Sequence, residues 1–212
     1  MELREVIDSR ASCRRFRGDA VPVEHLQEMV RLAGLAPSPG NSQPWRFVVV
    51  LGPETITRMG VAVRQRLAEV LPDPVDEKAA RARARVEWLA TFFTEAPAVI
   101  AAVHQPRRTS IDEALEGAPA SAGRAREELA RIHPELQAIG AAIENLLLAA
   151  TGMRYGACWL TAPLVARAAL EDILEIREPE RLVALVAVGR PVALAAEHRQ
   201  RRPLDEICEI RY

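Results

Sequence analysis

The chain has 212 residues, of which 49% are hydrophobic and 27% charged, with a formal net charge of −1. This balance is typical of a soluble globular chain that can bury a substantial core, and it predicts one domain spanning residues 1–212. It gives no support for binding to nucleic acid or to an acidic membrane surface, and no apolar run is long enough to span a membrane.

Helices outnumber strands in the first half of the chain. Apolar residues recur there at helical spacing, interrupted by two short runs that are bounded by turn residues and read as buried strands. The expected elements, in chain order, are helix 2–9, helix 23–35, strand 46–51, helix 54–71, helix 78–94 and strand 97–103.

The second half opens on a turn-rich stretch, residues 104–134, which we interpret as a lid or insertion. The expected elements that follow are helix 135–151, a strand or extended turn at 157–160, helix 163–174 and strand 181–189. The helix at 135–151 is apolar around most of its circumference, which predicts burial in a core or at a subunit interface. The final EICEIRY alternates apolar and polar residues, as an added strand would. Strands mixed with long helices predict an α+β fold.

Several common site types lack their sequence signatures. Cys13, Cys158 and Cys208 are far apart and form no CxxC, and the four histidines are isolated. We therefore expect neither a disulfide framework nor a metal site. Neither GxGxxG nor GxxxxGK[ST] occurs, which argues against a Rossmann or P-loop nucleotide site. The amino-terminal residues lack the apolar stretch of a signal peptide, so we expect a cytoplasmic protein.

The stretch APSPGNSQPWRFVVV, residues 36–50, places an unusual loop before a strand. Three prolines restrict φ within it, and Gly40 permits a positive φ. Asn41 and Gln43 each offer a side-chain donor and acceptor. A simple connection does not need restricted backbone angles and two amide side chains, whereas a loop that holds a flat polar heterocycle does. Trp45 is expected to pack in the core under this loop.

Basic residues alternate near both ends of the chain. In an extended segment, Arg10, Ser12 and Arg14 point the same way. Two guanidinium groups and a hydroxyl on one face suit a phosphate, because the arginine fork matches phosphate oxygens. Arg199 and Arg201 repeat the alternation near the carboxyl terminus. The alternative interpretation is a solvated basic turn and a basic tail.

Taken together, these motifs resemble the nitroreductase family of flavin enzymes. The matching stretches are RASCRRF, APSPGNSQPWRFVVV, IENLLLAATGMRYGACWLTAP, VALVAVGRP and RQRRPLDE, which occur in the family's order. The resemblance implies a central, mostly antiparallel sheet flanked by helices and extended by a partner's C-terminal arm. It also implies a homodimer that binds FMN between its subunits.

The resemblance further implies four groups of FMN-binding residues. Two lie at the phosphate, one lies along the isoalloxazine ring and ribityl chain, and one lies against the flavin from the partner subunit, offering a backbone N–H to its N5 atom. The two phosphate groups are Arg10, the Ala11 backbone, Ser12 and Arg14 near the start of the chain, and Arg199 and Arg201 in the tail. The residues along the ring and ribityl chain are Pro37, Ser38, Pro39, Asn41 and Gln43. The residues that face the flavin from the partner subunit are Thr161 and Ala162.

The activity implied is ping-pong transfer of two electrons. NADH or NADPH reduces the FMN, and a small-molecule acceptor such as a nitroaromatic compound or a quinone then takes the electrons. We expect no catalytic side chain, because the flavin carries the chemistry. The alternatives are reductive dehalogenation, dehydrogenation or cofactor biosynthesis on the same scaffold, or a flavin-binding protein without enzymatic activity.

Overall fold

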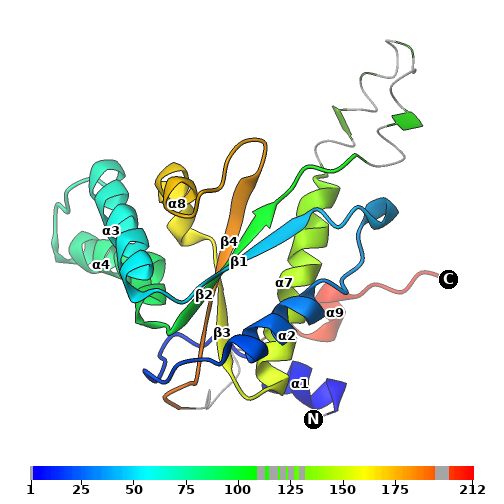
Figure 1. Ribbon diagram of the computed structural model, residues 1–212, viewed down its shortest axis with the longest axis horizontal. Coiled ribbons are helices and arrows are strands. Elements are labelled where there is room, and N and C mark those ends of the chain that lie inside the picture. The colour runs from blue at the N-terminus through cyan, green and yellow to red at the C-terminus, as the bar shows by residue number, and fades with distance from the viewer. Residues whose placement is uncertain are drawn as a thin grey trace.

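A four-stranded antiparallel sheet forms the centre of the fold (Figure 1). The computed structural model describes residues 2–108, 113–114, 119, 123, 127–128, 132–193 and 201–212. The strands are β1 (Trp45–Val50), β2 (Ala98–His104), β3 (Gly156–Leu160) and β4 (Arg181–Gly189). Their spatial order is β1-β2-β4-β3, so β1 and β3 are the edges of this sheet.

Helices cover both faces of the sheet (Figure 1). One face is covered by α3 (Pro53–Val70), α4 (Glu77–Thr91), α8 (Arg167–Ile173) and two 3-10 turns, η2 (Phe92–Glu95) and η4 (Ala162–Ala166). The other face is covered by α2 (Val23–Ala33) and α7 (Pro134–Gly152), with α1 (Leu3–Ser9) packed against α7. The short η1 turn (Pro39–Asn41) precedes β1, and α9 (Leu204–Ile207) lies in the carboxyl-terminal tail.

The two central strands are buried on both faces. Alternate residues of β2 enter two separate hydrophobic clusters, because successive side chains of a strand point to opposite faces. Val99, Ala101 and Val103 join the cluster on the α3 side, and Ala98, Ile100 and Ala102 join the cluster on the α7 side. This double burial explains why β2 and β4 read in the sequence as nearly continuous apolar runs.

Helix α7 has one buried face and one accessible face. Ile139, Ile143 and Leu146 are fully buried toward the sheet. On the other side Glu144 is exposed and Leu148 is only partly buried. The sequence allowed either a core or an interface role for this helix. The structure shows that its first face belongs to the core and leaves the second face open to a further contact.

The predicted α+β architecture with a mostly antiparallel sheet is confirmed. Element boundaries shift by a few residues, and the helix expected over 78–94 leaves α-geometry after Thr91. Within EICEIRY, Glu206 and Ile207 belong to α9 instead of a strand. An isolated strand has no hydrogen-bonding partner, so one chain alone gives this segment no reason to be extended. Most of the proposed lid, residues 104–134, lies outside the described residues.

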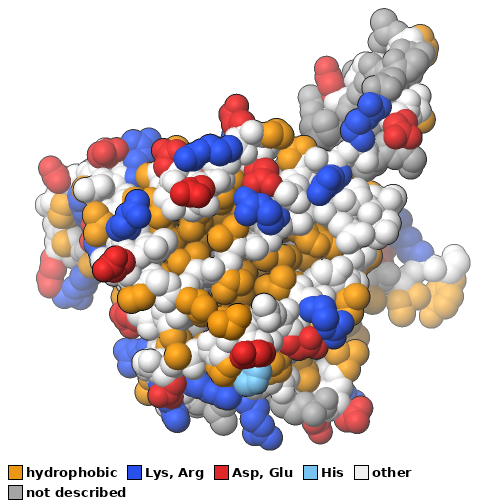
Figure 2. Space-filling model, viewed as in Figure 1, with side chains coloured by type: hydrophobic (Ala, Val, Ile, Leu, Met, Phe, Trp, Pro, Cys, Tyr) orange, Lys and Arg blue, Asp and Glu red, His pale blue; other side chains and the backbone are white. Residues whose placement is uncertain are grey.

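No helix in the described part of the chain combines the length and apolarity needed to cross a membrane. The face shown in Figure 2 carries a gathering of hydrophobic side chains near its centre, where Figure 1 places β1 in front. Val49 of β1 and the following Leu51 are both exposed. The β1 edge is therefore both unpaired in the described sheet and partly apolar.

Gly189, the last residue of β4, allows a close approach that a side chain would prevent. A Cβ placed there would lie 2.6 Å from Cδ of Pro97 and 3.0 Å from Cδ1 of Phe16. We expect Gly189→Ala to lower the free energy of unfolding by about 1–3 kcal/mol, the usual range for overpacking. Urea denaturation measures it, with Gly18→Ala as the matched control, since a Cβ at Gly18 would meet nothing within 4 Å. Equal midpoints for the two variants would contradict this packing argument.

Candidate functional site

The basic segment at the start of the chain lies in an extended conformation beside β3. Ser12 forms an isolated parallel bridge with Ala157, and the backbone N–H of Cys13 donates to the Ala157 carbonyl at 3.0 Å. Gly156 makes this approach possible, because a Cβ there would lie 2.6 Å from the Cβ and Sγ of Cys13. The extended conformation is the one in which Arg10, Ser12 and Arg14 were expected to share a face.

These three side chains influence Cys158 of β3 electrostatically or through a hydrogen bond. Burial raises the pKa of the Cys158 thiol, whereas the charges of Arg14 and Arg10 and a hydrogen bond with Ser12 act to lower it. All three residues therefore act on the same buried thiol, which indicates that they lie on the same side of the segment. Two guanidinium groups and a hydroxyl on one side of an extended segment offer several donors to an oxyanion.

Arg10 also forms an ion pair with helix α7. Its Nε atom lies 3.5 Å from Oε1 of Glu144, and its side chain is only 22% exposed. This ion pair orients the guanidinium and offsets part of its charge. Arg10 thus keeps a fixed direction at the C-terminal end of α1, where it is the capping residue.

Thr161 and Ala162 follow directly after β3, at the end farther from Ser12. Thr161 precedes the η4 turn, and both residues are exposed. Thr161 lies four positions after Ala157 in the chain, which corresponds to about 13 Å along a strand. The first N–H groups of a helical turn have no acceptor within the turn. One edge of the sheet therefore carries the basic cluster at one end and backbone donors at the other.

The loop before β1 is held in a defined and unusual conformation. Asn41 and Gln43 have φ values of 53° and 45°, and Gly40 has 56°. The Ser38 hydroxyl accepts a hydrogen bond from the Gln43 N–H at 2.9 Å, and the Gln43 amide donates to Oδ1 of Asn41 at 3.3 Å. Left-handed backbone at a residue other than glycine costs on the order of 1 kcal/mol or more and persists where the surroundings impose it.

The loop leaves its two amides accessible. Pro37, Pro39, Asn41 and Gln43 are exposed and Ser38 is partly buried. Trp45, expected to pack in the core, does lie half-buried against the α7-side cluster, and it also lines a pocket with Ser42 and Gln43. The loop thus has a defined conformation, and the side chains of Asn41 and Gln43 are exposed.

Within one chain, the loop and the basic cluster occupy opposite edges of the sheet. Three strand spacings from β1 to β3 amount to about 14 Å. The separation is also lengthwise: Trp45 is aligned with His104 and Arg181, whereas Ala157 is aligned with Val188 near the other end of β4. A single chain therefore does not bring these predicted site residues around one ligand.

Of the two arginines of the carboxyl-terminal basic pair, one lies within the described residues. Arg199 lies outside the described residues, and Arg201 is exposed. Every residue from 201 to 212 is exposed, including Leu204, Ile207 and Ile210, which are 72%, 58% and 70% exposed. The apolar side chains of the tail are not sheltered by their own chain.

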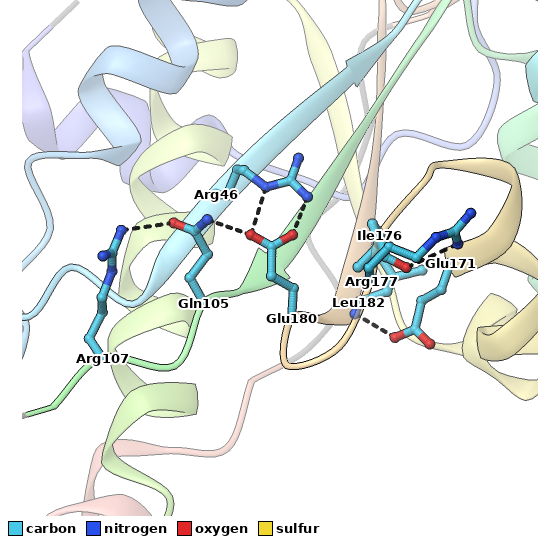
Figure 3. A network of polar contacts seen from close by, with 8 residues as sticks. All are labelled: Arg46, Gln105, Arg107, Glu171, Ile176, Arg177, Glu180 and Leu182. Carbon is cyan, nitrogen blue, oxygen red and sulfur yellow. Dashed lines mark hydrogen bonds and ion pairs between the residues drawn. The ribbon is translucent and has the colours of Figure 1, made fainter.

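The structure also shows a polar network that the sequence did not reveal (Figure 3). Glu180, just before β4, accepts hydrogen bonds from Arg46 of β1 through both carboxylate oxygens. Gln105, just after β2, donates to Oε1 of Glu180 and accepts from Nη2 of Arg107 at 3.3 Å. Arg107 then lines the pocket beside Ser42, Gln43 and Trp45.

This network stabilises the ionised form of Glu180. Hydrogen bonds from Arg46 and then from Gln105 hold the pKa of Glu180 below its ordinary value. A sequence signal did exist, since Gln105 and Arg107 follow a buried strand, where functional loops often begin. Glu180 lies 134 positions from Arg46 along the chain, so its role depends on strand order. Within the described residues, no group of three or more metal-ligating side chains is present.

Comparisons with known proteins agree with this fold. The Nitroreductase family model matches residues 7–190. The 5,6-dimethylbenzimidazole synthase of Rhodospirillum rubrum is 30% identical over 204 residues, covering 93% of this chain and 82% of that protein. Human iodotyrosine deiodinase 1 is 24% identical, covering 97% and 67%. The crystal structure of a BluB-like flavoprotein from Clostridium difficile 630 has a TM-score of 0.87 and 31% identity, with both chains fully covered.

We expect Arg10 to contribute directly to phosphate binding. Arg10→Ala should weaken FMN binding by about 1.5–3 kcal/mol, the range for a hydrogen bond to a charged group. Arg10→Lys should also lose affinity, because a point charge does not reproduce the guanidinium fork. Titration of the apoprotein with FMN measures both, with Arg15→Ala as the control from the alternate side of the same segment. Unchanged affinity in both Arg10 variants would assign Arg10 to a solvated turn.

Proposed function

This chain belongs to the nitroreductase family, and from that premise we propose that it is an FMN-dependent oxidoreductase. In this proposal NADH or NADPH supplies two electrons, and a nitroaromatic compound, quinone or similar small molecule accepts them. The observation that carries it is the β3 edge, with Arg10, Ser12 and Arg14 gathered at one end and the Thr161–Ala162 turn at the other.

The dimensions and chemistry of this edge fit FMN. The separation of about 13 Å along β3 suits a molecule with a phosphate at one end and a flat ring at the other. Arg10, Ser12 and Arg14 would hold the phosphate, and the Ala11 backbone would help. No dinucleotide fingerprint is present in the sequence, which favours FMN over FAD. Arg199 and Arg201 are proposed to add charge to the same phosphate.

Bound FMN would supply the redox chemistry, accepting a hydride from the nicotinamide and passing two electrons to the acceptor. The residues of this chain would bind and orient. The N–H groups at the start of η4 would face the ring, and Asn41 and Gln43 would meet its imide and carbonyl edge with matching donors and acceptors. No side-chain acid or base is assigned a catalytic role, because the flavin reaction needs none of them in this scheme.

A complete site requires two chains. The loop at 37–43 and the basic cluster lie at opposite edges of one sheet, so each would meet its counterpart from a partner in a homodimer. Ser12 lies beside Ala157 of β3, and Thr161 and Ala162 follow the same strand. The phosphate cluster and the Thr161–Ala162 turn would therefore contact the same FMN from one protomer. We therefore propose that the 37–43 loop is the part contributed by the partner, in place of the expected contribution from Thr161 and Ala162.

The carboxyl-terminal tail is proposed to tie the two chains together. Leu204, Ile207 and Ile210 are exposed on a segment that finds no shelter on its own chain. The β1 edge is open in the described sheet and carries the exposed Val49. An unpaired edge is a ready acceptor for a strand from another molecule. Pairing of residues 208–212, which follow α9, with the partner's β1 would cover that edge, while Leu204 and Ile207 of α9 would pack against the partner's surface. We also propose one domain and a cytoplasmic location.

A second function on the same scaffold is cofactor biosynthesis. The specific observation is the 30% identity to a 5,6-dimethylbenzimidazole synthase across nearly the whole chain, together with the TM-score of 0.87 to a BluB-like flavoprotein. Reductive dehalogenation is a third candidate, because human iodotyrosine deiodinase 1 is 24% identical to this chain. These reactions differ in the molecule placed over the flavin.

The proposed function is tested by identifying the bound cofactor and then screening acceptors. We expect heat-released FMN in the purified protein and NAD(P)H oxidation that accelerates with a quinone or nitroaromatic acceptor, following ping-pong kinetics. Recovery of FAD, or no flavin after reconstitution, would refute the cofactor assignment. Aerobic formation of 5,6-dimethylbenzimidazole without acceptor turnover would favour the biosynthetic function instead, and FMN without any turnover would indicate a binding protein.

Deletion of residues 204–212 tests the shared site. We expect the truncated chain to dissociate at concentrations where the full chain is dimeric and to release FMN in parallel, because stability then depends on protomer concentration. Sedimentation with flavin absorbance detection measures both. An Ile207→Asp/Ile210→Asp variant separates loss of apolar contacts from loss of chain length. A truncated, flavin-loaded dimer would show that the tail is not the tie, and a flavin-loaded full-length monomer would refute the shared site.

A further inference from the structure

We infer that Arg107 recognises an oxyanion on the molecule that exchanges electrons with the flavin, a carboxylate or phosphate group held in the pocket beside the 37–43 loop. This inference rests on the proposed function and concerns which substrates that site prefers. Three features support it: the pocket itself, the contact that positions Arg107, and the balance of charges among Arg46, Glu180 and Arg107.

The pocket is built from polar groups at one end of the sheet. Ser42, Gln43, Trp45 and Arg107 line a pocket of about 390 Å³ that is open to solvent. Ligand pockets for small molecules fall in the range of about 300–1,000 Å³. Gln43 comes from the loop proposed to meet the flavin, so a molecule in this pocket would lie next to the cofactor. Trp45 supplies an aromatic wall on the same side.

Backbone pairing brings Arg107 to this wall. The Gln105 N–H donates to the Pro44 carbonyl at 3.0 Å, which extends the β1–β2 ladder by one residue beyond the pair Trp45 and His104. The chain after Gln105 therefore runs back along the loop that leads into β1. Arg107, two residues later, lines the same pocket as Ser42 and Gln43.

The side chain of Arg107 is positioned by a relay through Gln105. Glu180 accepts from the Gln105 amide nitrogen, which directs Oε1 of Gln105 toward Arg107 (Figure 3). The 3.3 Å contact with Nη2 involves one of the five N–H donors of the guanidinium. An amide oxygen orients the arginine without neutralising its charge.

The charge of Glu180 is already balanced by a different arginine. Arg46 donates to both oxygens of that carboxylate, and its side chain is 36% exposed compared with 22% for Glu180. Counting Arg46, Glu180 and Arg107 leaves one positive charge, and Arg107 is the member that faces the pocket. A planar guanidinium at the wall of a polar pocket suits a carboxylate or phosphate, which it contacts through parallel N–H groups.

The test compares substrates that differ only in charge. The flavin-loaded Arg107→Ala variant should raise KM for 4-nitrobenzoate about five- to tenfold while leaving 4-nitrobenzamide within twofold, as expected for a partly exposed charge-assisted contact. NADPH compared with NADH provides a second pair. A change confined to 4-nitrobenzoate identifies the acceptor as the source of the anion, and a change confined to NADPH identifies the donor.

Two further variants complete the design. Gln105→Glu places a carboxylate beside Arg107 and should reduce the preference for 4-nitrobenzoate in the same direction, whereas Arg177→Ala, which removes a cation paired with Asp172 outside the pocket, should leave it unchanged. Benzoate titration, followed by flavin absorbance, supplies a binding readout without turnover. Equal KM ratios in wild type and Arg107→Ala, with FMN retained, would overturn the inference alone. Loss of FMN from Arg107→Ala would place this residue in the cofactor site and also overturn it. A protein without flavin would refute the proposed function instead.

Discussion

The close approach of the amino-terminal segment to the end of the sheet is the contact on which the candidate site depends. Gly156 and Gly189 face each other across β3 and β4, and neither position has room for a side chain. Cys13 fills the space over Gly156, and Phe16 with Pro97 fills the space over Gly189. Because these surfaces meet, residues 10–17 lie extended along the sheet, and their alternate side chains converge near Cys158. The basic cluster is thus a consequence of backbone packing.

Burial of the central strands determines where polar chemistry can be placed. Both faces of β2 and β4 are covered by apolar clusters, so an unpaired charge there would carry a large desolvation cost. Polar groups accordingly collect at the edges and ends of the sheet. The basic cluster lies along β3, the amide loop precedes β1, and the Arg46–Glu180–Gln105–Arg107 network closes the end of the sheet near that loop.

This placement of the polar groups favours a site that is formed between two protomers. The surfaces that a flavin would need are each well formed within one chain, yet they are separated by the width of the sheet. The exposed tail, the open β1 edge and the accessible side of α7 all remain available for a second protomer. A homodimer would cover these surfaces and complete the site by the same association, so cofactor binding and assembly would be coupled.

The local features follow from the sequence alone. Apolar periodicity located the helices and strands to within a few residues, and turn residues identified the rigid loop at 37–43, because both signals arise from interactions between neighbours in the chain. The alternation of Arg10, Ser12 and Arg14 likewise needed only an extended backbone. Tertiary structure decided which distant residues meet. The strand order β1-β2-β4-β3 placed Glu180 beside Arg46 and Gln105, and put the loop and the basic cluster at opposite edges. The order in which strands pair depends on how both faces of the sheet pack. The spacing of residues along the sequence does not specify that order.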